Sequence, residues 1–117
     1  MDYHSDVGLA ISNKLVNLSS QEDIAALAEI FGMPTAISIE GDYFYMLESV
    51  KWYNSDYKIG EVIALIADWD DENRNEFLFI ELGEDYSDVT EAGSWYSNPF
   101  EFGWVRKLVF EFPKLLG

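Results

Sequence analysis

The chain has 117 residues, of which 49% are hydrophobic and 16% aromatic, so we expect one compact domain over residues 1–117 and not a disordered chain. Its 7 Lys and Arg residues against 22 Asp and Glu residues give a formal net charge of −15, which disfavours nucleic acid and anionic membranes as direct partners, because both are bound through clustered Lys and Arg. The lack of cysteine excludes disulfides, thiolate catalysis and Cys-ligated zinc. The N-terminus has no signal-peptide pattern and no apolar stretch reaches the roughly 20 residues of a membrane helix, so we expect a cytoplasmic protein.

The first predicted elements are a strand and a helix. Residues 3–12 alternate between apolar side chains and polar or small ones, which is typical of a strand with one buried face. Residues 18–34 carry an apolar stripe at helical spacing. Ser19 and Glu22 fit a capping box at the start of this helix, and Gly32 marks its end.

The middle of the chain predicts a hairpin and a second helix. Residues 35–53 contain two β-prone runs around a turn at Gly41 and Asp42. Residues 55–73 form the second amphipathic segment, for which Ser55 or Asp56 is the expected N-cap.

The last third of the chain predicts a buried strand at residues 75–83 and shorter strands at residues 88–96 and 105–112. The resulting order is β-α-β-β-α-β with a C-terminal β extension. We therefore expect an α+β fold of the ferredoxin-like split type, in which both helices cover one face of an antiparallel sheet.

A run of acidic residues stands out between Asp68 and Glu91, where Arg74 is the only basic residue. The first members follow one another at the C-terminal end of the second predicted helix. The helix dipole disfavours a negative group there by roughly 0.3–1 kcal/mol. Stability therefore does not account for the run, which contains ten carboxylates: Asp68, Asp70, Asp71, Glu72, Glu76, Glu81, Glu84, Asp85, Asp88 and Glu91.

Cation binding is one alternative for this run. The segment from Asp68 begins with the Asp-x-Asp pattern of a calcium loop. It departs from the pattern at the fifth, sixth and twelfth positions, which are Glu72, Asn73 and Phe79. We predict no metal or other cofactor, and a non-standard cation site at Asp70, Asp71 or Asp85 remains the open alternative.

Catalytic chemistry has little support in the sequence. With 22 acidic residues, some carboxylate pair is inevitable and carries no specificity. His4 is the only histidine and lies beside the N-terminus, and there is no glycine-rich phosphate loop with a lysine. We predict that the protein is not an enzyme and has no catalytic residues.

The aromatic residues are interleaved with acids, so they indicate a core and a covered sheet face or a protein-binding patch, and not a base-stacking surface. Arg106, Lys107 and Lys114 form a small basic patch near the C-terminus, whose simplest role is pairing with the acidic surface.

Three interpretations of the acidic surface compete. It is solvated charge that keeps the protein soluble, a set of carboxylates that imitate nucleic-acid phosphates towards a basic protein, or part of an enzyme or cation site. The second gives the candidate partner-binding residues, which are Asp68, Asp70, Asp71, Glu72, Glu76, Glu84, Asp85, Asp88 and Glu91.

Three stretches of the chain, Tyr3–Ser12, Val50–Ile63 and Phe79–Gly103, resemble a family of small acidic proteins encoded by tailed phages and prophages. The shared motifs are an opening Tyr-x-Ser-Asp-Val-x-Leu-Ala strand, a Lys-Trp-Tyr segment, and a Gly-Glu-Asp run before Asn-Pro-Phe. The resemblance implies no catalytic residues. It implies an inhibitor that acts in the host cytoplasm on a basic nucleic-acid-binding or defence protein, of the anti-CRISPR or anti-restriction type. The alternative is an accessory domain or small enzyme whose acidic surface is merely solvated.

Overall fold

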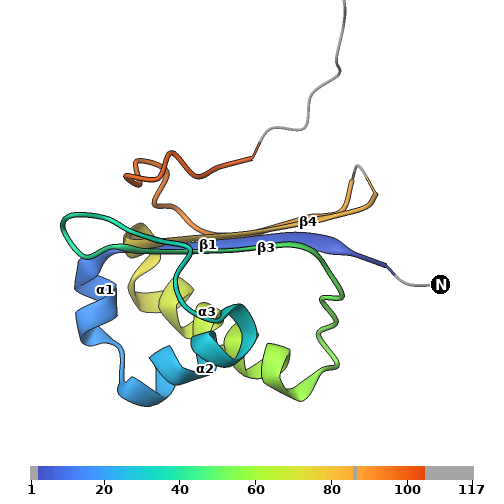
Figure 1. Ribbon diagram of the computed structural model, residues 1–117, viewed down its shortest axis with the longest axis horizontal. Helices are drawn as coiled ribbons and strands as arrows, with labels where there is room; N and C mark the ends of the chain where they lie inside the picture. Colours follow the sequence, from blue (N-terminus) through green and yellow to red (C-terminus); the bar gives the residue numbers. More distant parts are fainter. Residues whose placement is uncertain (1–2, 86, 105–117) are drawn as a thin grey trace, which may run out of the picture.

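An antiparallel sheet with helices on one face forms the body of the protein (Figure 1). The computed structural model describes residues 3–85 and 87–104. Its elements in chain order are β1 (Ser5–Ile11), α1 (Asn13–Leu18), α2 (Gln21–Phe31), β2 (Ala36–Ile37), β3 (Tyr43–Val50), α3 (Tyr57–Glu72), the 3-10 turn η1 (Arg74–Glu76), β4 (Phe77–Gly83) and β5 (Val89–Gly93).

The mixed α/β character and the antiparallel sheet are confirmed, whereas the ferredoxin-like topology is not. The sheet has five strands in the order β2-β3-β1-β4-β5, so a further strand lies beyond β4. Two helices, α1 and α2, instead of one, connect β1 to β2. The strand predicted at residues 88–96 exists as the shorter β5, and the strand predicted at residues 105–112 lies outside the described residues.

The structure corrects the predicted capping box at the start of α2. The capping box of α2 is formed by Ser20 and Asp23 and not by Ser19 and Glu22. Ser19 is unavailable because its Oγ donates to the Leu15 carbonyl at 2.7 Å and so closes the end of α1. That short helix was not predicted, since six residues are too few to show a helical period.

The N-cap of α3 matches expectation. Asp56 is the cap, and its carboxylate accepts hydrogen bonds from the backbone N–H groups of Lys58 and Ile59 at 2.9 and 3.2 Å. These bonds satisfy two of the free N–H groups at the start of the helix.

The main core lies between the sheet and the helices. Val7, Leu9 and Ile11 of β1 have no exposed surface and pack with Leu27 of α2 and Val62 of α3. Burying a side chain of this size contributes about 1.5–3 kcal/mol. The alternation predicted from residues 3–12 therefore sets the helix-covered face of the central strand.

The opposite face of the sheet is covered by residues 95–104, which Figure 1 shows in orange and red above the strands. Phe44 of β3 stacks on Phe100 and packs against Phe102, with ring centroids 5.3 and 5.0 Å apart. The segment is held in shape by the buried Asn98, which donates to the carbonyls of Trp95 and Phe102 and accepts from the Phe102 N–H at 2.8 Å. No helix in the described part of the chain is long and apolar enough to cross a membrane.

We expect Gly8→Ala to destabilise the protein by about 1–3 kcal/mol, although alanine is otherwise the better strand residue by about 0.5–1 kcal/mol. A Cβ at position 8 would lie 2.5 Å from two ring carbons of Phe102, so this ring, which packs against Phe44, has to shift. Urea unfolding measures the effect. The control is Gly60→Ala in α3, where a Cβ meets nothing closer than 3.7 Å and a helix favours alanine. A Gly8→Ala variant as stable as the Gly60→Ala variant contradicts this account.

Candidate functional site

The acidic run is divided by β4 into two groups. Asp68, Asp70, Asp71 and Glu72 belong to the end of α3 and Glu76 to η1, all before β4, whereas Glu84, Asp85 and Asp88 follow it. A seven-residue strand is about 20 Å long, so the two groups lie at opposite ends of the sheet. Glu91 is separate, on β5. The structure therefore does not bring the nine predicted residues together into one row.

Asp70 is occupied by contacts within the protein. Its Oδ1 accepts a hydrogen bond from Arg74 Nη1 at 2.6 Å, which is also an ion pair, and another from the Gly93 N–H at 3.0 Å. The second bond joins α3 to β5. A carboxylate that completes this junction is a structural residue.

Glu76 and Glu91 are also used internally. Glu76 Oε1 accepts from Ser12 Oγ at 2.6 Å and so connects the start of α1 to the start of β4. Glu91 accepts from the Tyr96 hydroxyl and from Trp104 Nε1, the latter at 3.0 Å, and so fixes the covering segment. The bond to Glu91 raises the pKa of Tyr96.

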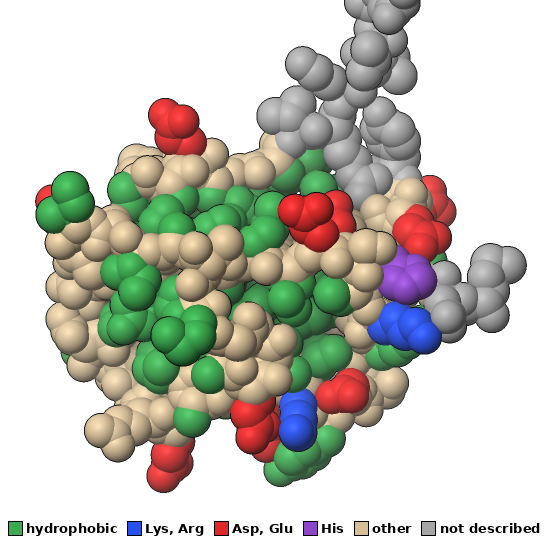
Figure 2. Space-filling view, viewed as in Figure 1, with side chains coloured by type: hydrophobic (Ala, Val, Ile, Leu, Met, Phe, Trp, Pro, Cys, Tyr) green, Lys and Arg blue, Asp and Glu red, His purple; other side chains and the backbone are tan. Residues whose placement is uncertain are grey.

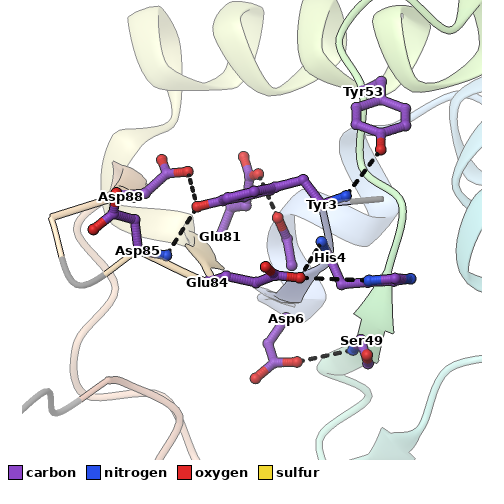
Figure 3. A network of polar contacts seen from close by, with 10 residues as sticks. Tyr3, His4, Asp6, Ser49, Tyr53, Glu81, Glu84, Asp85 and Asp88 are labelled. Atoms are coloured by element: carbon purple, nitrogen blue, oxygen red, sulfur yellow. Dashed lines mark hydrogen bonds and ion pairs between the residues drawn. The ribbon is translucent and has the colours of Figure 1, made fainter. Parts of the chain in front are cut away.

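The carboxylates beyond β4 hold the N-terminal residues in place (Figure 3). The Tyr3 hydroxyl donates to Asp88 Oδ2 at 2.7 Å and accepts from the Asp85 N–H at 3.0 Å. The His4 N–H donates to Glu84 Oε1 at 2.8 Å, and His4 Nδ1 lies 3.5 Å from the same oxygen. The bond to Asp88 raises the pKa of Tyr3. This group therefore anchors the start of β1 to the loop after β4.

Glu81, which was not a predicted site residue, lies half-buried on β4 close to this group. Its Oε2 accepts from Ser5 Oγ at 3.0 Å. Burial raises the pKa of Glu81, and the charge of Asp88 raises it further, while the hydrogen bond from Ser5 lowers it.

Three predicted residues remain exposed and form no hydrogen bond or ion pair with the described part of the chain: Asp68, Asp71 and Glu72. Asp68 and Glu72 line a hollow of about 230 Å³ between the C-terminal end of α3 and the ends of α1 and α2. Asp23 of α2 is a third acidic side chain at this hollow. We refer to it as the α3-end hollow, and its remaining lining residues are Leu15, Leu18, Ser19, Leu65, Trp69 and Asn73.

The α3-end hollow is negative and partly apolar. No Lys, Arg or His lines it, and the last turn of α3 contains no basic residue. The negative end of the α3 dipole adds to the carboxylate charges there. Leu18 at this hollow is 64% exposed, so an apolar contact lies next to the acids. Such a site is suited to a Lys or Arg side chain, which has an apolar stem and a cationic end.

The sequence did not identify Asp23 and Leu18 as members of this site. Both residues stand more than 40 positions before Asp68 in the sequence, and only the packing of α1 and α2 near the end of α3 brings them together. The acidic residues in the first turn of α2 could have indicated a binding site, but acidic residues are equally typical of any helix N-terminus.

The face shown in Figure 2 has many hydrophobic side chains, and its acidic side chains are scattered in separate places, most of them near the margin. Among residues 3–85 and 87–104, no group of three or more His, Cys, Asp or Glu side chains is arranged to hold a metal ion. The chain matches no protein-family model, no curated protein and no solved structure.

We expect Asp70→Ala to lower the free energy of unfolding by about 1–2 kcal/mol, because it leaves the Gly93 N–H and Arg74 without their shared acceptor. Asp71→Ala, the same change one residue later at an exposed position, should alter stability by no more than about 0.5 kcal/mol. Urea unfolding of both variants provides the comparison. Equal effects for the two substitutions would show that Asp70 has no special structural role.

The raised pKa of Glu81 predicts a pH dependence of stability. Between the ordinary pKa of 4.5 and the raised one, the folded protein keeps a proton that the unfolded chain releases, so the free energy of unfolding falls as the pH rises through this range. Glu81→Gln keeps an acceptor for Ser5 and removes the charge. It should be at least as stable as the parent at pH 7, with a smaller advantage at pH 4.

Urea unfolding between pH 4 and 7 measures this difference, and Glu48→Gln at an exposed position of β3 is the control. A constant loss of stability in Glu81→Gln at every pH would contradict the assignment.

Proposed function

We propose that the protein binds a basic surface of a partner protein through the α3-end hollow and through the exposed Asp71, which lies in the same turn of α3 but does not line the hollow. The observation that carries the proposal is the position of Asp68, Asp71 and Glu72, which form no contact with the described residues although the helix dipole opposes their charge. Asp70 and Glu76 differ from these three residues, because each accepts a hydrogen bond from a distant segment of the chain. These carboxylates lie where the helix dipole disfavours negative charge, and within residues 3–85 and 87–104 they form no contact that stabilises the fold. A cationic partner would supply the missing interaction.

The partner that suits this site is a nucleic-acid-binding protein. Its groove contains Lys and Arg side chains spaced for phosphates, and the carboxylates at the end of α3 would occupy some of these positions. A net charge of −15 would steer the encounter over a long range, and salt would weaken it. Occupation of the groove excludes nucleic acid, so the expected consequence is inhibition. A defence nuclease or restriction enzyme is a target of this kind.

The proposed contact is smaller than the nine residues predicted from the sequence. Asp70, Glu76, Glu84, Asp88 and Glu91 accept internal hydrogen bonds, so they contribute to the field of the protein more than to a fitted surface. The same internal bonds favour the second candidate, an accessory domain with a solvated acidic surface. In that case Asp68, Asp71 and Glu72 affect solubility alone.

We also propose that the fold is a variant of the ferredoxin-like split arrangement. The partial order β2-β3-β1-β4 and its antiparallel pairings support this, and β5 would be an addition at the β4 edge.

The triple variant Asp68→Asn/Asp71→Asn/Glu72→Gln should lose partner binding by roughly tenfold, because exposed charge pairs contribute up to about 1 kcal/mol each. The measurement is affinity capture from bacterial lysate at 50 and 500 mM salt, followed by elution with duplex DNA. The parent should retain basic proteins at low salt and release them to the DNA.

The control is Glu40→Gln/Glu48→Gln/Glu101→Gln, which removes the same charge from exposed positions outside the hollow. If both triple variants retain the same proteins with the same salt dependence, the hollow is not the binding site. If DNA does not release the retained proteins, the nucleic-acid-mimicking role is wrong.

A further inference from the structure

The outer face of the sheet carries a groove that the acidic-surface proposal does not use. Two hollows, of about 90 and 150 Å³, meet there and share Asp6 and Leu82. The register places Gly8 beside Ile80 of β4 and Met46 of β3, so these residues form the floor of the smaller hollow. We call the two hollows together the outer-face groove.

The two parts of the outer-face groove differ in polarity. The smaller part is apolar, with Phe102 and Trp104 beside its floor of Gly8, Met46 and Ile80. The larger part is polar and acidic and is lined by His4, Asp6, Ser49, Leu82, Gly83 and Glu84. A ligand that fills both parts therefore needs an apolar group and, a short distance away, a cation.

A β-bulge fixes the junction of the two parts. The pairing of β1 with β3 shifts between Ser5 and Val7, and Ser49 opposite this point has a φ of +53°. Asp6 Oδ1 accepts the Ser49 N–H at 2.9 Å, as Figure 3 shows. A non-glycine residue in this conformation is uncommon, and bulges commonly redirect a side chain. The carboxylate of Asp6 is thus held where the apolar and acidic parts meet.

The described chain ends at this groove. Trp104, the last described residue, lines the apolar part and is 37% exposed. The sequence that follows, residues 105–117, is VRKLVFEFPKLLG, in which apolar residues flank Arg106 and Lys107. It contains three of the seven basic residues and one of the 22 acidic residues, so residues 1–104 hold four basic residues against 21 acidic ones.

We propose that residues 105–117 are the ligand of the outer-face groove, with an apolar side chain in the part lined by Met46 and with Arg106 or Lys107 at Asp6 and Glu84. The distance permits it, because two extended residues span up to about 7 Å and an Arg or Lys side chain reaches further. The charges complement each other, since the acidic end of the groove faces the most basic stretch of the sequence. The basic residues near the C-terminus therefore act within the molecule, on the sheet face opposite the α3-end hollow.

Disulfide trapping in the full chain tests this placement directly, because the protein has no cysteine of its own. Met46→Cys is combined in turn with Val105→Cys, Leu108→Cys and Phe110→Cys. The control combines the same three substitutions with Ala25→Cys, an exposed position on α2 and hence on the helix-covered side. Leu82→Cys replaces Met46→Cys if that variant does not fold.

At least one Met46 or Leu82 pair should form an intramolecular disulfide about tenfold faster than the matching Ala25 pair, measured by mass spectrometry of the monomer. Asp6→Asn and Glu84→Gln keep acceptors for the Ser49 and His4 N–H groups. Adding both substitutions should lower the rate of disulfide formation in that pair by roughly threefold. High salt should have the same effect.

Equal rates on the two faces would overturn the proposal. Disulfides mainly between two differently tagged copies would assign the groove to a second molecule instead. Rates that do not respond to Asp6→Asn/Glu84→Gln would contradict the role of the acidic end. None of these outcomes depends on the α3-end hollow, so the two proposals fail separately.

Discussion

The whole arrangement depends on β1, the central strand, because it is paired on both sides and covered on both faces. It hydrogen-bonds to β3 and β4, so no edge of it is free. Its odd-numbered residues Val7, Leu9 and Ile11 face the helices, and Gly8 faces Phe102. A strand in this position tolerates no shift in register, since a shift by one residue would exchange its two faces. The helices, the covering segment and the outer-face groove are all placed relative to it.

The acidic residues have two separate uses in this framework. Most of those with a defined partner bind backbone N–H or hydroxyl groups of distant segments: Asp70 reaches β5, Glu76 reaches Ser12, and Asp88 reaches Tyr3. Charged acceptors form stronger hydrogen bonds than neutral ones, so carboxylates suit such long-range contacts. The protein thus gains tertiary connections from a composition that at first indicates only a repulsive surface. Asp68, Asp71 and Glu72 at the end of α3 have no such contact within the described residues.

The two candidate surfaces lie on opposite sides of the sheet and differ in character. The α3-end hollow has an uncompensated negative charge beside an exposed Leu18. The outer-face groove combines an apolar floor with an acidic end and lies where the described chain ends. Under the two proposals, Arg106 or Lys107 would neutralise the acidic end of the outer-face groove, and the α3-end hollow would be left for an external cation.

The sequence by itself determined the types of the longer elements, though not α1, and the inner face of the sheet, because alternation in residues 3–12 and the helical stripes of α2 and α3 are local signals. It placed the acidic run correctly around β4 but could not tell structural carboxylates from free ones, since adjacent Asp70 and Asp71 look alike in the chain. Only the tertiary structure decided that difference, through contacts such as that of Asp70 with Gly93, 23 residues away. The pairing of β5 with β4 and both hollows arose in the same way. Each depends on which distant segments meet, and no local pattern encodes that pairing.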